Sequence, residues 1–144
     1  MKVHEHGNGD EGLLAEAAFT SVPKSVSEAR RWVRGTYAAL LAELFQTCEL
    51  LVSEVATNAV THTDSGTFRV RLFSPGLRIE VWDESPSLPE RRAASPLAEG
   101  GRGLALLELL APGYTVDALG PLGKVVCFTP QSPSPLEATA AVRR

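Results

Sequence analysis

A hairpin signal in the middle of the chain constrains the fold more than any other feature of the sequence. Apolar and polar residues alternate through residues 67–72, and the alternation resumes through residues 77–81 after the turn signal Ser74-Pro75-Gly76. A period of two places the apolar side chains on one face of a strand. A short turn between two such runs is typical of a β-hairpin. The apolar face of this hairpin must be buried by a second layer.

Patterns on both sides of the hairpin supply that layer and extend the sheet. We expect a strand at residues 18–22, helices at residues 25–41, 47–61 and 104–110, and strands at residues 114–118 and 124–129. Ser25 and Ser27 are candidate N-caps of the first helix. This element order predicts an α+β fold, a two-layer α/β sandwich with a mixed, mostly antiparallel sheet and helices on one face.

One domain accounts for the chain, because 144 residues can bury a sizeable core and 44% hydrophobic with 22% charged residues is an ordinary globular balance. We expect this domain at residues 17–130. The flanking residues 1–16 are polar and residues 131–144 are rich in Pro, Ser and Ala, so both are expected to be poorly ordered tails. Residues 85–99 contain three prolines and are expected to form a long loop, of a length that is usually functional or disordered.

Charge and composition argue against several classes of partner. The net charge is −3 and no basic run is present, so a nucleic-acid partner is not expected. No apolar run approaches the roughly 20 residues that span a bilayer, and residues 1–12 do not resemble a secretory signal. Cys48 and Cys127 both lie in apolar segments, which favours reduced, buried packing residues and a cytoplasmic protein.

A polar stripe interrupts the helix expected at residues 47–61. At about 100° per residue, Glu54, Asn58 and His62 lie within about 80° of one another, at the edge of an apolar face. A carboxylate there is costly unless it is paired or does chemistry. An Asn amide oxygen suits Mg²⁺, and a carboxylate one turn away can orient a nucleophile. The alternative is an ordinary amphipathic helix whose His62 interacts with the helix dipole.

Two further features fit a nucleotide. Asp83 follows the second hairpin strand, where its carboxylate could accept a hydrogen bond from an exocyclic amine or cap the next turn. The segment Gly100-Gly101-Arg102-Gly103 precedes an apolar helix, where bare amides and Arg102 could hold a phosphate; the alternative is a flexible loop. Gly123-Lys124 is expected to be a structural turn between strands.

In this order and spacing, these segments resemble the GHKL (histidine-kinase-like) ATPase superfamily, and most closely its RsbW-like anti-sigma-factor serine/threonine kinases of the actinobacterial type. Leu51-Val-Ser-Glu-Val-Ala-Thr-Asn-Ala-Val-Thr-His62 resembles the N-box of that family. Val81-Trp-Asp-Glu-Ser-Pro-Ser-Leu-Pro89 resembles its adenine box, and Gly100-Gly-Arg-Gly-Leu-Ala-Leu-Leu107 its phosphate box. Gly123-Lys-Val-Val126 resembles its last strand, so the resemblance covers about residues 18–129.

The resemblance implies a Bergerat-type ATP site under a lid at residues 85–99. Glu54 would be the catalytic base and Asn58 would hold Mg²⁺, while Asp83 would bind the adenine amine. The implied ATP-binding residues are Asn58, Asp83, Gly101, Arg102, Gly103 and Leu104. Members of this branch transfer the γ-phosphate of ATP to a serine of a small anti-anti-sigma (STAS-type) partner and sequester a sigma factor. The resemblance therefore implies a protein kinase that regulates transcription by partner switching, and it leaves a homodimer open.

The chain departs from the superfamily in two places. The usual Asp-x-Gly-x-Gly is replaced by Asp83-Glu84-Ser85-Pro86-Ser87, and the threonine often found after the last glycine turn is absent, with Val125 near its place. These departures motivate an alternative function, a non-catalytic nucleotide-responsive module that binds other proteins. A sensor-kinase fragment is a third hypothesis, but the sequence shows no upstream dimerisation helix with a phosphoacceptor histidine.

Overall fold

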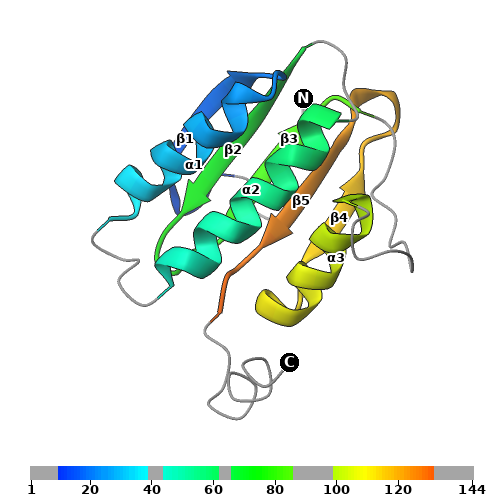
Figure 1. Ribbon diagram of the computed structural model, residues 1–144. Coiled ribbons are helices and arrows are strands. Elements are labelled where there is room, and N and C mark those ends of the chain that lie inside the picture. The colour runs from blue at the N-terminus through cyan, green and yellow to red at the C-terminus, as the bar shows by residue number, and fades with distance from the viewer. Residues whose placement is uncertain (1–9, 39–43, 62–65, 86–98, 132–144) are drawn as a thin grey trace.

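The computed structural model describes residues 10–38, 44–61, 66–85 and 99–131 (Figure 1). In chain order the elements are β1 (Leu13–Thr20), α1 (Lys24–Thr36), α2 (Phe45–Thr61), β2 (Thr67–Phe73), β3 (Ile79–Asp83), α3 (Glu99–Leu110), β4 (Thr115–Ala118), a short 3-10 turn η1 (Gly120–Leu122) and β5 (Lys124–Phe128). None of the helices in these ranges is long and apolar enough to cross a membrane.

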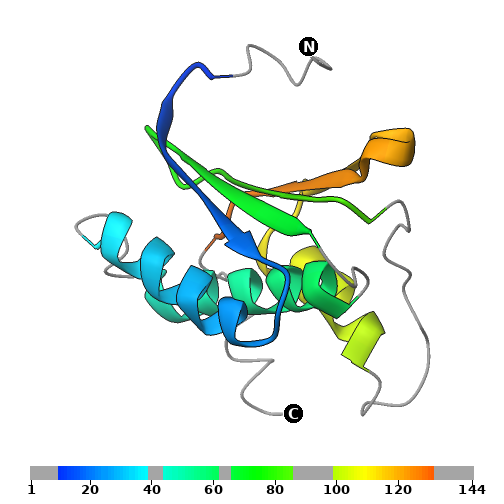
Figure 2. The ribbon, with the colours of Figure 1, turned by 90° about the horizontal axis from the view of Figure 1, so that it is seen from above.

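The strands form one sheet with the order β1-β2-β3-β5-β4. Each neighbouring pair of described strands is antiparallel, so the expected parallel component of the sheet is not observed in these ranges. All three helices lie on the same face of the sheet, as the view from above shows (Figure 2). The predicted α+β, two-layer sandwich is therefore confirmed.

The core fills the space between the helices and the inner face of the sheet. The period-two pattern predicted which hairpin side chains point inward, and each of them is buried. These residues are Phe68, Val70, Leu72, Ile79 and Val81 on the strands, and they pack with Leu51, Val52, Val55, Ala56 and Ala59 of α2. Burying a large apolar side chain contributes about 1.5–3 kcal/mol, so this layer is the main source of stability.

The first strand starts earlier than the sequence predicted. β1 begins at Leu13, so residues 13–16, which were expected in the N-terminal tail, are in the sheet, and the strand ends at Thr20. Its partner is β2, in a register that sets Phe19 opposite Phe68. These two rings stack with their centroids 5.3 Å apart. Pairing with the hairpin therefore extends a strand that has weak β-propensity of its own.

The first helix is shorter than expected and is not capped by serine. α1 ends at Thr36, and its N-cap is Pro23, with no side-chain capping hydrogen bond. Ser25 is buried within the helix, and the Ser27 hydroxyl donates to the Lys24 carbonyl at 3.1 Å. The predicted serine caps are therefore wrong.

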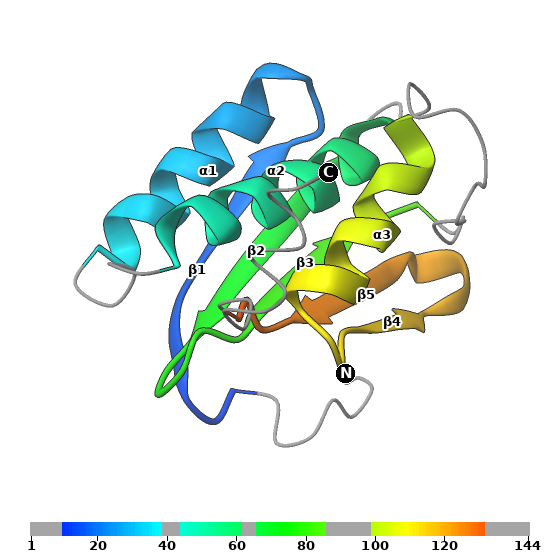
Figure 3. The same cartoon turned by 60° about the horizontal axis from the view of Figure 1, so that its bottom comes forward.

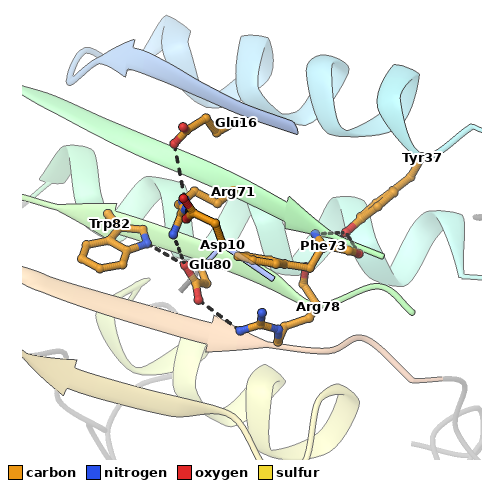
Figure 4. Close-up of polar contacts among 8 residues, drawn as sticks. All are labelled: Asp10, Glu16, Tyr37, Arg71, Phe73, Arg78, Glu80 and Trp82. Atoms are coloured by element: carbon orange, nitrogen blue, oxygen red, sulfur yellow. Dashed lines mark hydrogen bonds and ion pairs between the residues drawn. The ribbon is translucent and has the colours of Figure 1, made fainter. Parts of the chain in front are cut away.

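Tyr37, directly after α1, ties the helix layer to the hairpin. Its hydroxyl lies 2.9 Å from the Phe73 carbonyl and 3.1 Å from the Arg78 carbonyl, and it accepts the Phe73 N–H at 2.9 Å (Figure 4). Burial raises the pKa of Tyr37 well above its ordinary value, so the hydroxyl remains protonated and can donate.

The outer face of the sheet carries a charged network centred on Glu80, which is 0% exposed. Arg71 Nη1 lies 3.3 Å from one Glu80 oxygen, and the Trp82 indole N–H donates to the same oxygen at 2.9 Å. Arg78 Nη1 lies 3.1 Å from the other (Figure 4). Arg71 also forms an ion pair with Asp10. The buried carboxylate is thus fully engaged, which is the condition under which a buried charge is tolerated.

The two cysteines are free thiols, as expected. Cys48 is buried in the core, and burial raises its pKa to about 12. Cys127 is only half-buried, and in the sheet register it lies opposite Glu80. The expectation of a buried packing residue therefore holds for Cys48 alone.

Candidate functional site

Four segments meet at one end of the molecule. These segments are the C-terminal half of α2, the end of β3, the start of β5 and the beginning of α3, and they lie at the same end of the molecule in two views (Figure 1 and Figure 3). α2 contacts both α3 and β3. These segments carry the residues that the sequence predicted for a nucleotide site.

Glu54 and Asn58 lie on the side of α2 that faces α3. The point of closest approach is Gly103: a Cβ placed there would lie 3.2 Å from Asn58 Nδ2 and 3.8 Å from Glu54 Cβ. Glycine at this position therefore allows α3 to pack directly over the two polar side chains. Glu54 is 7% exposed and Asn58 is half-buried. The predicted spacing of one helical turn does bring both side chains to one surface.

The glycine segment is part of the helix and not a turn before it. α3 begins at Glu99, so the expected start at residue 104 is wrong, and Gly101, Arg102 and Gly103 have helical backbones. The first four amides of a helix have no intrahelical acceptor, so the amides available to an anion are those of residues 99–102. Gly103 lies beyond this turn. Leu104 is 8% exposed and packs in the core.

Some of the predicted site lies outside the described residues. These parts are His62, the side chain of Arg102 and most of the expected lid, residues 86–98. Their predicted roles stay predictions.

Asp83 is the last residue of β3 and its carboxylate is buried. It forms an ion pair with Lys124, whose Nζ lies 3.1 Å from Oδ1 and 2.9 Å from Oδ2. The backbone N–H of Ser85 also donates to Oδ1 at 2.8 Å. The Asp83 carboxylate therefore does cap the following turn, as one of the two interpretations predicted. It also forms an ion pair with Lys124 that the sequence did not predict.

Lys124 is the residue beside the predicted base-binding carboxylate that sequence reasoning missed. The sequence predicted Lys124 at the start of the last strand with only a structural role, and it is indeed the first residue of β5, directly opposite Asp83 in the sheet register. Its side chain is 1% exposed. Val125, which was expected near this position of the family pattern, is one residue further along the strand, opposite Trp82. The strand register, which places Lys124 opposite Asp83, was the only signal that could have identified it.

Gly123 holds β5 against the end of β3. Its φ is +116°, and a Cβ there would lie 1.9 Å from the Asp83 carbonyl oxygen. Only glycine allows this approach, which places Lys124 beside Asp83. Ser85, in contrast, occupies a position where the family usually has glycine. Its backbone is not strained there, because no described non-glycine residue has a positive φ.

The arrangement fits a magnesium nucleotide at this end of the fold. The described residues contain no group of three or more His, Cys, Asp or Glu side chains that could hold a metal by themselves. Mg²⁺ usually takes one or two protein ligands and completes its shell with water and substrate phosphates. The Asn58 amide oxygen, with Glu54 one turn away, meets this requirement beside Gly103 of α3.

A family model described as a histidine kinase-like ATPase domain matches residues 19–129. No curated protein matches the chain. The family match includes α2, β3, α3 and β5, and it indicates an ATP-binding domain. By this match, the chain belongs to the histidine kinase-like ATPase domain family.

Proposed function

We propose that this protein binds ATP with Mg²⁺ and acts as an anti-sigma-factor-type serine/threonine kinase of the RsbW-like branch. Its substrate would be a serine of a small anti-anti-sigma, STAS-type protein, and it would also bind a sigma factor. The observation that carries the proposal is the close approach of Glu54 and Asn58 to Gly103 near the start of α3, at the end of the fold where β3 ends with Asp83. Family membership supports ATP binding, and the resemblance of the three sequence segments motivates the narrower kinase role and leaves a homodimer open. The two cysteines in apolar segments favour a cytoplasmic location.

Phosphoryl transfer needs mainly positioning of the reactants and neutralisation of charge. ATP would supply the phosphoryl group, and Mg²⁺ would neutralise its negative charge. The Asn58 amide oxygen would hold the metal, and the free amides at the start of α3, including that of Gly101, would hold phosphate oxygens. Glu54 would accept the proton of the partner's serine hydroxyl as that oxygen bonds to the γ-phosphorus, while the bond from that phosphorus to the β–γ bridging oxygen breaks and ADP leaves. Asp83 would accept a hydrogen bond from the base amine.

The catalytic role of Glu54 can be tested with an isosteric variant. Glu54→Gln keeps the size of the side chain and removes its basicity, so phosphorylation of a panel of STAS-type proteins with radiolabelled ATP should fall by about 10²-fold. Glu49→Gln is the matched control, because Glu49 lies on the same helix in an ion pair with Arg34. Undiminished phosphorylation by Glu54→Gln would remove Glu54 from the mechanism.

The second candidate is a nucleotide-responsive module that binds partners without transferring phosphate. The ion pair between Asp83 and Lys124 favours it, because the carboxylate expected to bind the base already has a charged partner. This candidate predicts ATP binding and a nucleotide-dependent change in partner affinity, with no labelled phosphate on any member of the panel.

A further inference from the structure

Lys124 lies directly in front of the Asp83 carboxylate. Its Nζ contacts both carboxylate oxygens, at 3.1 and 2.9 Å, and the two side chains are 1% and 3% exposed. A single ammonium within reach of both oxygens lies near the bisector of the carboxylate. A second donor that approached both oxygens would have to come from the same side.

The backbone adds to this occupation of the carboxylate. The Ser85 N–H donates to Oδ1 at 2.8 Å, so this oxygen already has two donors. An ionised carboxylate has about four acceptor positions in all. A base amine that reached Asp83 would therefore share the carboxylate with the Lys124 ammonium or displace it.

We propose that Lys124 is an internal competitor for the carboxylate that recognises the base, and that it sets the base selectivity of the nucleotide site. The inference rests on the proposed ATP binding and on the role of Asp83 in it. Displacing Lys124 exchanges a charge-assisted contact for one with a neutral amine, and it leaves a buried ammonium without its partner. While Lys124 is present, the 6-amino group of adenine thus adds little to affinity.

The opposite arrangement defines the competing outcome. An ammonium beside Asp83 could donate to the N1 acceptor of adenine while Asp83 accepts from the 6-amino group. In that case Lys124 would assist the base instead of competing with it, and its removal would weaken binding.

The test compares two ligands that differ only in the 6-amino group. The dissociation constants of ADP and of purine riboside 5′-diphosphate, which lacks that amine and keeps N1, are measured with Mg²⁺ by calorimetry. Because both ligands carry the same phosphates, the ratio of their affinities cancels the attraction between phosphate and the lysine charge. The variants are Lys124→Met and Lys124→Gln, and Lys24→Met is the control because Lys24 is exposed at the start of α1.

The proposal predicts that preference for ADP rises by at least about tenfold in both Lys124 variants and is unchanged in Lys24→Met. Lys124→Gln retains a side-chain donor for Asp83, so it provides the measurement if the methionine variant does not fold. A preference that stays the same or falls, with ADP still bound, would overturn the competition and leave ATP binding intact. Absence of ADP binding by the wild type and every variant would overturn both proposals.

Discussion

Replacing Gly123 by alanine would place a methyl group where the backbone of β3 already lies. The new Cβ would be 1.9 Å from the Asp83 carbonyl oxygen and 2.8 Å from Glu84 Cα, so the start of β5 would have to move by about 1 Å. The backbone of Gly123, at φ +116° and ψ −139°, lies in a region essentially restricted to glycine, which adds a conformational cost of about 1–2 kcal/mol for an L-residue. Displacing β5 also weakens backbone pairing and the ion pair of Lys124 with Asp83, for about 2–3 kcal/mol more. The expected loss of stability is about 3–5 kcal/mol.

Two other glycines separate these costs. Gly113 also has a positive φ, +93°, but a Cβ there meets nothing within 4 Å, so Gly113→Ala should cost only the conformational part, about 1–2 kcal/mol. Gly35 lies in α1 with open space around it, so Gly35→Ala should stabilise the protein by about 0.5–1 kcal/mol. Urea unfolding followed by tryptophan fluorescence gives all three values. The reasoning is refuted if Gly123→Ala destabilises the protein no more than Gly113→Ala.

Three further predictions concern the site, the outer face of the sheet and the thiols. Gly103→Ala should fold normally, because Asn58 Nδ2, 3.2 Å from the new Cβ, can shift by a few tenths of an ångström. The affinity for Mg·ATP, measured by calorimetry, should fall, because Asn58 is displaced. Unchanged affinity would show that the contact between Gly103 and Asn58 is not part of the ATP site. Glu80→Gln should cost about 2–4 kcal/mol in urea unfolding, because the buried Glu80 side chain loses the charge that Arg71 and Arg78 contact, and a cost below 1 kcal/mol would contradict this. Iodoacetamide at pH 8 should label Cys127 well before Cys48, since the Cys48 thiol is buried with a pKa of about 12; equal rates, read by mass spectrometry, would be inconsistent with that burial.

Strong periodicity made the centre of the fold predictable. The alternating residues of β2 and β3 and the apolar stripe of α2 each specify one face, and those faces form the core. The spacing of Glu54 and Asn58 follows from helix geometry alone, so their common surface was also predictable. A local apolar pattern determines which face of a strand or helix is buried, and this explains why the predicted core agrees with the structure.

The errors occur where distant segments decide the structure. β1 contains three alanines and a glutamate, which have little intrinsic preference for a strand, and its pairing with β2 determines the conformation. The glycines at the start of α3 are poor helix formers, yet Gly103 fits against Asn58 and the helix continues through it. No local pattern predicts the ion pair of Lys124, because it depends on which residue of β3 lies opposite Lys124 in the sheet.

We propose that α2 and α3 together form a magnesium-dependent ATP site. The most direct measurement is calorimetric titration of ATP with Mg²⁺ into the wild type, Asn58→Ala and Gln46→Ala, where Gln46 is an exposed amide on the same helix. We predict binding by the wild type and Gln46→Ala with equal affinity, and at least about tenfold weaker binding by Asn58→Ala. That difference should shrink when EDTA removes the metal. No binding by the wild type, or equal affinity of Asn58→Ala, would contradict the account.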